Sequence, residues 1–189
     1  MKKNIAVITI IFTIVFLCNG YAQKGRHLNN RIMVEGFYTR NLGSFGEIWS
    51  NSVGGYVGYG LAFPDHNLLI IRTGFISNNL NEEIKYANAS SVIIPLELGG
   101  RYYFLFDGIQ PFIQFINGLN LIFENNNLEG VAGNKTFLKY CWQVGLGVTV
   151  YLNNQFGIDI GVNYQSNFYQ TNAMNTGFEY VLGLSFSMD

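Results

Sequence analysis

The sequence is poor in charge, cysteine, histidine and proline. Only 12% of its 189 residues are charged, and the formal net charge is −1. An average soluble domain has about 25% charged residues. Without a basic excess the chain does not fit a nucleic-acid-binding protein. The hydrophobic fraction of 49% excludes intrinsic disorder, and the length suits a single domain.

The scarcity of cysteine and histidine limits the chemistry of the chain. There are two cysteines, Cys18 and Cys141, and two histidines, His27 and His66. Their spacing does not match a metal-ligand motif, and no glycine-rich phosphate-binding motif stands out. The sequence therefore predicts no metal site and no cofactor.

Long apolar runs are restricted to the N-terminus. Two lysines follow the first methionine, residues 5–18 are apolar, and Gly20 and Ala22 give the small-x-small pattern of a signal-peptidase site. We expect residues 1–22 to be a cleaved signal peptide, and residues 23–189 to form one domain.

Two other interpretations of this segment fit the sequence less well. An uncleaved helical anchor would need about 20 apolar residues, more than this run supplies. A lipoprotein would be lipidated on Cys18, but Leu17 stands where that processing site usually has a small residue. Cleavage after Ala22 leaves a net charge of −3 and the single cysteine Cys141, which excludes an intramolecular disulfide.

Glycine and aromatic residues are abundant, with 22 glycines and 16% aromatics, and the mature chain alternates apolar and polar residues with period 2. The clearest segment is 137–152, FLKYCWQVGLGVTVYL. This period indicates β-strands with one apolar face. The eight predicted strands are 31–40, 53–63, 68–77, 92–106, 110–123, 137–152, 155–168 and 177–188.

Short and long connections alternate between these strands. Three connections are tight turns of turn-forming residues, which indicate hairpins. Outer-membrane barrels have short turns at the periplasmic end and longer loops outside. The sequence therefore predicts an all-β protein, an eight-stranded antiparallel up-and-down transmembrane β-barrel. The short connections are 64–67, 107–109 and 153–154, and the long ones are 41–52, 78–91, 124–136 and 169–176.

Mid-strand charges avoid the apolar face of every strand. A soluble barrel would show the opposite polarity, with an apolar lumen, and a soluble sandwich is the remaining alternative. An eight-stranded barrel is only wide enough for side chains to fill it. We expect a structural network of paired charges in the lumen, with an ion or proton pathway as the alternative. The predicted lumen charges are Glu35, Arg72, Glu97, Arg101, Lys139, Asp159 and Glu179.

Aromatic residues near the strand ends fit the girdles that outer-membrane barrels place at the two membrane surfaces. The predicted outward-facing residues are Tyr38, Phe63, Phe75, Phe104, Phe106, Phe112, Phe156 and Phe178. Glycines on the second predicted strand, among them Gly54, Gly58 and Gly60, are expected on the lumen face, where small residues relieve crowding.

The segment 94–106, IPLELGGRYYFLF, and the final strand with Gly183, Phe186 and Met188 resemble the small outer-membrane β-barrel family typified by OmpA and OmpX. Val181 and the terminal Asp189 depart from the usual C-terminal signal of that family. The resemblance implies a location in the outer membrane of a diderm bacterium. It also implies contact with outer-membrane lipid and insertion by the barrel-assembly machinery.

Catalysis is not expected. Some barrels of this size modify lipid A, which needs a base such as His beside a nucleophile at the outer leaflet. His27 and His66 both fall at the periplasmic end of the predicted barrel. We therefore expect a non-enzymatic surface or structural protein. A weak or gated ion pore is the alternative, and a lipid-modifying enzyme comes third.

The four long loops are the expected site of any extracellular ligand. Trp49 is the candidate contact residue, because exposed Trp is enriched at binding hot spots. The alternative is that Trp49 extends the second strand or anchors it at the membrane surface. The loop charges are Glu47, Glu82, Glu83, Glu124 and Glu129 against Lys85 and Lys135, a net −3.

Overall fold

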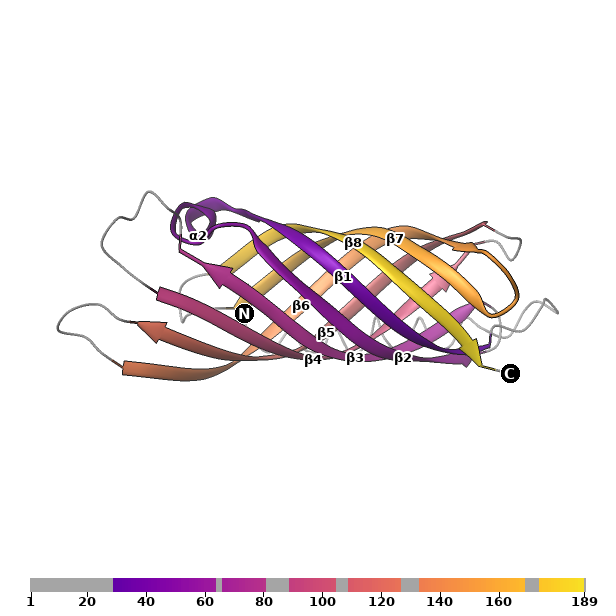
Figure 1. Ribbon diagram of the computed structural model, residues 1–189, viewed down its shortest axis with the longest axis horizontal. Coiled ribbons are helices and arrows are strands. Elements are labelled where there is room, and N and C mark those ends of the chain that lie inside the picture. Colours follow the sequence, from indigo (N-terminus) through magenta and orange to yellow (C-terminus); the bar gives the residue numbers. More distant parts are fainter. Residues whose placement is uncertain are drawn as a thin grey trace, which may run out of the picture.

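The computed structural model shows a barrel of eight long strands (Figure 1). It describes residues 29–63, 66–80, 89–104, 109–126, 133–168 and 174–188. The predicted signal peptide 1–22, His27 and the loop residues Glu82, Glu83, Lys85 and Glu129 lie outside these ranges.

The eight predicted strands are confirmed, and one short helix lies between the first two. The elements are β1 (Asn30–Leu42), α2 (Gly43–Ile48), β2 (Ser52–Phe63), β3 (Asn67–Asn79), β4 (Ala89–Tyr103), β5 (Ile109–Asn126), β6 (Gly133–Tyr151), β7 (Phe156–Phe168) and β8 (Met174–Met188). No helix in the described part of the chain is long and apolar enough to cross a membrane.

Each strand pairs antiparallel with its neighbours in sequence, and β1 closes the barrel against β8. The closing register runs from Asn30↔Met188 to Leu42↔Thr176. Closure matters because hydrocarbon offers no hydrogen bonds, so a sheet in lipid must pair its backbone internally. Because Asn30 pairs with Met188, the start of β1 and the end of β8 lie together, at the same end as the short turns.

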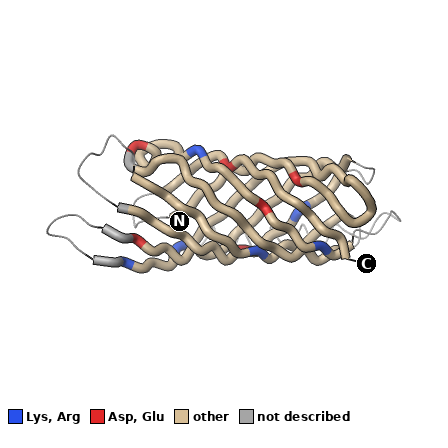
Figure 2. The backbone as a smooth tube through the Cα atoms, viewed as in Figure 1, with Lys and Arg blue, Asp and Glu red and all other residues tan. Residues whose placement is uncertain are grey.

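Alternation of buried and exposed residues, which is strict in β1 and β8, separates a lumen face from an outer face. In β1 and β8 every second side chain is buried from Arg31 to Asn41 and from Asn175 to Ser187. The outer face is apolar, with Leu182 at 63% and Leu146 at 65% exposure. Charged positions are few and spread along the barrel (Figure 2). The predicted polarity, apolar outside and charged inside, is the polarity of the structure.

The loops are shorter than expected because the strands continue past the predicted boundaries. Strand β5 runs to Asn126 and β6 begins at Gly133. Glu124 and Lys135, assigned above to a loop, are therefore strand residues that face each other across the β5–β6 ladder. Both strands continue through residues of low β-propensity, because backbone pairing with the neighbouring strand keeps each of them extended.

One of the predicted lipid-facing aromatics points the other way. Phe112 is 3% exposed and lies in the lumen, so its predicted orientation was wrong. The alternation in β5 is set by Gln110 and Gln114, which are buried on the same face. Tyr38, Phe63, Phe75, Phe104, Phe156 and Phe178 are exposed as predicted, and Phe106 lies outside the described residues.

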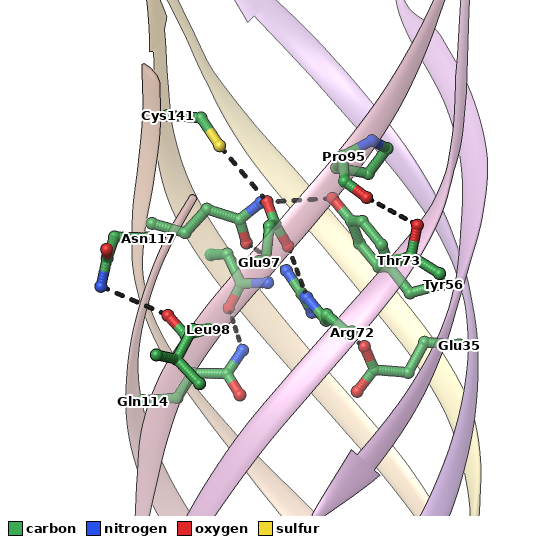
Figure 3. Close-up of polar contacts among 12 residues, drawn as sticks. Glu35, Tyr56, Arg72, Thr73, Pro95, Glu97, Leu98, Gln114, Asn117 and Cys141 are labelled. Atoms are coloured by element: carbon green, nitrogen blue, oxygen red, sulfur yellow. Dashed lines mark hydrogen bonds and ion pairs between the residues drawn. The ribbon is translucent and has the colours of Figure 1, made fainter. Parts of the chain in front are cut away.

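The β3–β4 ladder is interrupted once, at a proline. Pairing stops at Thr73↔Leu96 and resumes at Ile76↔Ile93. Pro95 has no N–H to donate to the ladder. Its carbonyl accepts a hydrogen bond of 2.7 Å from the Thr73 hydroxyl, so the interruption leaves that carbonyl paired (Figure 3).

Two apolar clusters fill the lumen at different heights. The upper cluster, toward the loops, contains Phe37, Phe45, Trp49, Tyr56, Ile76, Ile93, Ile122 and Val181. The lower cluster, toward the short turns, contains Met33, Leu68, Ile70, Tyr103 and Phe112. Along β1 the buried residues run Met33, Glu35, Phe37, so a polar layer separates the two clusters.

Candidate functional site

The polar layer in the middle of the lumen is the most concentrated chemistry in the described structure. Of the seven predicted lumen charges, six are at least 96% buried there. They come from β1, β3, β4, β7 and β8 and are Glu35, Arg72, Glu97, Arg101, Asp159 and Glu179.

Five of these charges form an alternating chain of ion pairs. Glu97 Oε2 lies 2.6 Å from Arg72 Nε, and Arg72 Nη1 lies 2.9 Å from Glu35 Oε2 (Figure 3). The other carboxylate oxygen of Glu35 lies 3.2 Å from Arg101 Nη2, and Arg101 Nη1 reaches Asp159 Oδ2 at 3.3 Å. Glu35 thus joins the two guanidinium groups, and no member of the chain is buried without an opposite charge.

Hydrogen bonds join three members of this chain, Arg72, Glu35 and Arg101, to five further side chains in a closed circuit of eight, called here the lumen ring. On one side, Arg72 Nη2 donates to Gln143 at 2.7 Å, Gln143 Nε2 donates to the Tyr56 hydroxyl at 3.2 Å, and Tyr56 donates to Glu179 at 2.9 Å. On the other side, Arg101 Nε donates to Gln114 at 3.0 Å.

Asn163 closes the circuit. Its amide accepts from Gln114 at 2.8 Å and donates to Glu179 at 2.8 Å. Each strand supplies one member of the lumen ring, in strand order Glu35, Tyr56, Arg72, Arg101, Gln114, Gln143, Asn163 and Glu179.

The lumen ring crosses the barrel instead of following its wall. The bonds from Gln143 on β6 reach Arg72 on β3 and Tyr56 on β2, which are not neighbours of β6 in the sheet. The two guanidinium groups also stack on aromatic rings, Arg72 over Tyr56 at 3.8 Å and Arg101 over Phe112 at 3.9 Å. Such stacking stabilises a desolvated cation. The arrangement places side chains across the middle of the lumen.

Glycines make room for the lumen ring. Gly58 is paired with Arg72, Gly183 with Glu35, and Gly145 with Asn163. A Cβ at Gly145 would lie 1.8 Å from Asn163 Oδ1, and one at Gly58 would lie 2.9 Å from the Cβ of Arg72. The expected role of Gly58, relief of crowding on the lumen face, therefore has a specific cause in the Arg72 side chain.

Solved structures of the same architecture supply the comparison. Neisserial surface protein A has a TM-score of 0.61 at 13% identity, over 87% of this chain and 100% of its own. Ail of Yersinia pestis has 0.58 at 13% identity, over 85% and 99%. The N-terminal barrel domain of Pseudomonas aeruginosa OprF has 0.51 at 16% identity, over 86% and 100%. This is the fold of the small outer-membrane β-barrels.

No protein-family model and no curated protein matches the sequence. The likeness to these outer-membrane barrels therefore lies in backbone architecture. The expectation of an OmpA-like eight-stranded barrel is confirmed at that level.

Lys139 lies apart from the lumen ring. It is on the inner face of β6 but only half-buried, and its ammonium is 5.9 Å from the centre of the Phe137 ring. Among the described residues it makes no ion pair within 4.0 Å. In this barrel the predicted seven-charge network is a set of six buried charges and one outlying lysine.

Sequence reasoning missed several polar residues of the lumen. Arg31 is 1% exposed, donates to the Tyr103 hydroxyl at 3.0 Å and lies over the Tyr103 and Tyr151 rings. Its parity with Glu35 in β1 was the signal that could have revealed it. Nothing in the sequence distinguishes the uncharged ring members from the many other residues on the same polar faces. These members are Tyr56, Gln114, Gln143 and Asn163.

Trp49 is buried, and the alternative in which it extends the second strand is confirmed in part, because it forms a β-bridge with Leu80 beyond the end of the β2–β3 ladder. It is 7% exposed and packs in the upper cluster, with its ring 6.1 Å from Phe45 of α2. The exposed contact surface expected of Trp49 is therefore absent, because the turn through α2 directs Phe45 and Trp49 onto Phe37 and Tyr56. Trp49 covers apolar lumen residues beneath it.

The described residues hold no group of three His, Cys, Asp or Glu side chains suited to a metal ion. His66 lies in the turn before β3, at the end of the barrel away from α2, and its carbonyl accepts from the Tyr103 amide at 2.9 Å. The buried thiol of Cys141 faces Glu97 Oε1 at 3.7 Å.

Proposed function

We propose that the protein is a non-enzymatic outer-membrane surface protein whose barrel is a closed, structural support for its external loops. The observation that carries the proposal is the lumen ring, in which bonds from Gln143 span the barrel between strands that are not neighbours. Ion pairs with all partners present keep this layer fixed, since exposing any one member would leave its partner unpaired.

Two further observations support an outer-membrane location. The outer face of the strands is apolar, as contact with lipid requires. One solved structure with a TM-score of 0.50 is a major outer membrane protein of Thermus thermophilus. With the predicted signal peptide, export to the periplasm and insertion by the barrel-assembly machinery follow as parts of the proposal.

An external ligand bound through the loops is the second part of the proposal. The structurally similar Ail is an attachment invasion locus protein and was solved with the heparin analogue sucrose octasulfate. By analogy, the loop end of this barrel is where we expect contacts with another molecule. Because Trp49 is buried, it is not expected to provide them.

Conductance measurements test the closed lumen. The purified protein in planar lipid bilayers is expected to give no steady ion conductance. A conductance that is lost when Arg72 or Glu97 is neutralised would instead favour the ion pore. Mass analysis of lipid A from cells that express the protein is expected to show no change, and a new lipid A species would establish an enzyme.

Fractionation tests the location independently. The protein is expected in the outer-membrane fraction, with a gel mobility that changes on heating because a closed barrel resists detergent until it is boiled. Recovery from the soluble periplasm with no change in mobility would contradict the proposal.

A further inference from the structure

A hollow lies on the outer face of the barrel, over strands β1 to β5, and is called here the outer hollow. Its volume is about 680 Å³. Most of the side chains around it point outward, because they alternate along the strands with buried lumen residues such as Arg72 and Glu97. The outward-facing residues include Ile32, Val57, Ile71, Leu96, Leu98 and Asn117.

Asn117 is a polar residue in the middle of an otherwise apolar outer face of β5. Its Nδ2 donates to the Leu98 carbonyl on the neighbouring strand at 3.2 Å (Figure 3). An amide has two N–H donors and a carbonyl acceptor. Among the described residues no hydrogen bond uses the second donor or Oδ1. The outward-facing residues of β5 are Ile109, Pro111, Ile113, Phe115, Asn117, Leu119, Leu121 and Phe123.

The remaining donor and acceptor of Asn117 indicate what kind of molecule covers the outer hollow. Hydrocarbon offers no hydrogen bonds, so a polar group left unpaired in it costs free energy. An acyl chain would fill the hollow and leave the amide unpaired. Apolar contact alone does not favour a protein over lipid, because lipid tails are as apolar as leucine. We therefore expect an occupant that brings a donor and an acceptor to the depth of Asn117.

A second copy of the chain brings both groups. Two copies that are inserted in the same direction are related by a two-fold axis along the membrane normal, so a residue near that axis faces itself. With the axis beside Asn117, each amide donates its second N–H to the Oδ1 of the other. Each amide then uses both donors and its carbonyl.

The outer surfaces on the two sides of Asn117 also complement each other in shape. β5 lies between β4, which lines the outer hollow, and β6, which begins an aromatic patch. Around a two-fold axis at Asn117, the hollow of each copy faces the aromatic patch of the other. The aromatic patch consists of Tyr140 with Phe168, at 6.0 Å between ring centres, and Trp142 with Tyr164, at 5.9 Å.

We propose that the protein forms a two-fold symmetric dimer in the membrane through the outer hollow and the aromatic patch. A reciprocal pair of hydrogen bonds between the two Asn117 side chains lies at its centre. The dimer goes beyond the proposed surface role, and it rests on the proposed location in the outer membrane.

Sedimentation equilibrium of the mature chain, folded in density-matched detergent micelles, tests the dimer. The unaltered protein is expected to show a reversible equilibrium between monomer and dimer. Asn117→Leu is expected to raise the dissociation constant of the dimer about tenfold, because it removes the central hydrogen bonds. Asn79→Leu is the matched control and is expected to leave the constant unchanged, since Asn79 is exposed at the loop end of β3.

Filling the outer hollow tests the shape of the interface. Leu96→Trp adds bulk inside the hollow and is expected to raise the dissociation constant about tenfold. Leu182→Trp is the matched control, because Leu182 has a similar exposure, 63% against 60%, and lies on β8, across the barrel from β4. Its dissociation constant is expected to equal that of the unaltered protein.

A gel mobility that changes on heating shows that each variant is folded, so loss of the dimer is distinguished from loss of the barrel. A folded chain that stays monomeric at every concentration would overturn the proposal, and a lipid retained on that monomer in native mass spectrometry would identify an acyl chain as the occupant. Equal dissociation constants within either pair of variants would also overturn it. Recovery from the soluble periplasm would contradict the membrane location itself, which a monomer in the outer membrane would not.

Discussion

At the scale of single residues, the lumen combines large charged side chains with glycines on the neighbouring strand. Glu97 lies opposite Gly118, just as Arg72 lies opposite Gly58. This pairing lets an arginine or glutamate extend across a narrow lumen and reach a partner on a distant strand. The same pairing makes the site sensitive in two ways, to loss of a charge and to added volume.

Loss of a charge is tested at Arg72. Arg72→Met removes the cation between Glu35 and Glu97, and leaves both carboxylates buried with fewer partners. The free energy of unfolding is expected to fall by about 3–5 kcal/mol, measured by urea titration of the barrel in lipid vesicles. Lys139→Met is the matched control, and its effect should stay within about 0.5 kcal/mol, since Lys139 makes no ion pair among the described residues. Equal effects of the two changes would contradict the lumen ring.

Added volume is tested at Gly145. Gly145→Ala places a Cβ where Asn163 Oδ1 would be 1.8 Å away, so the amide must move and the lumen ring must open. The expected loss of stability is about 1–3 kcal/mol in the same titration. Gly36→Ala is the control, because its Cβ meets nothing closer than the Leu182 carbonyl at 3.9 Å. If Gly36→Ala lowers stability as much as Gly145→Ala, the loss comes from replacing any glycine in a strand, and not from crowding of the lumen ring.

At the scale of elements, β8 shows how one strand presents polar residues to the lumen on one face and apolar residues to the outside on the other. Its buried residues include Glu179 and Ser185, and its exposed residues include Leu182 and Leu184 at 63% and 61%. The odd positions satisfy a polar lumen, and the even positions face lipid. A charge is therefore expected to be costly on the even positions and more so in the middle of the strand than at its end.

Leu182→Arg tests this depth dependence. In a bilayer the change is expected to cost about 2–4 kcal/mol, as for a cation near the membrane midplane. Met174→Arg, at the loop end of the same strand and 49% exposed, is expected to cost only about 0–1 kcal/mol. Urea titration in vesicles measures both. A soluble barrel would tolerate Leu182→Arg, so a neutral result would contradict the membrane assignment.

In the α2 turn a connection, and not a strand, places side chains in the lumen. The chain has two tryptophans, so Trp142→Phe leaves Trp49 as the only one. Because Trp49 is 7% exposed in the upper cluster, its fluorescence is expected to resist quenching by acrylamide in the folded barrel. Unfolding in urea is expected to make it accessible. Efficient quenching in the folded state would contradict the burial of Trp49 and would support its prediction as an exposed contact residue.

At the scale of the whole molecule, closure converts eight similar strands into one cooperative unit. The ring bond from Tyr56 to Glu179 joins residues 123 positions apart, and the β1–β8 ladder joins the two ends of the domain. Both contacts join one of the first two strands to the last strand. Stability and lumen closure are therefore properties of the complete barrel. Because the barrel's own side chains occupy the lumen, we assign contacts with other molecules to the loops.

The sequence predicted most of the architecture because its signals are local. Period-2 alternation marks the two faces of each strand without reference to other strands, and tight turns fix which strands are neighbours. Where alternation weakens, as around Phe112, the predicted face was wrong. Strand ends such as Glu124 were also missed, because pairing with a neighbour extends a strand beyond its own preference.

The sequence by itself therefore determined the eight strands, their order, and the inward orientation of the seven predicted lumen charges. Only the tertiary structure decided how those charges meet. Lys139 and Arg72 both lie on the lumen face, yet one has no ion pair among the described residues and the other joins two carboxylates. Alternation records the side of a strand on which a residue lies. Its partners across the lumen depend on barrel closure and register, because these alone set the distance between strands that are not neighbours.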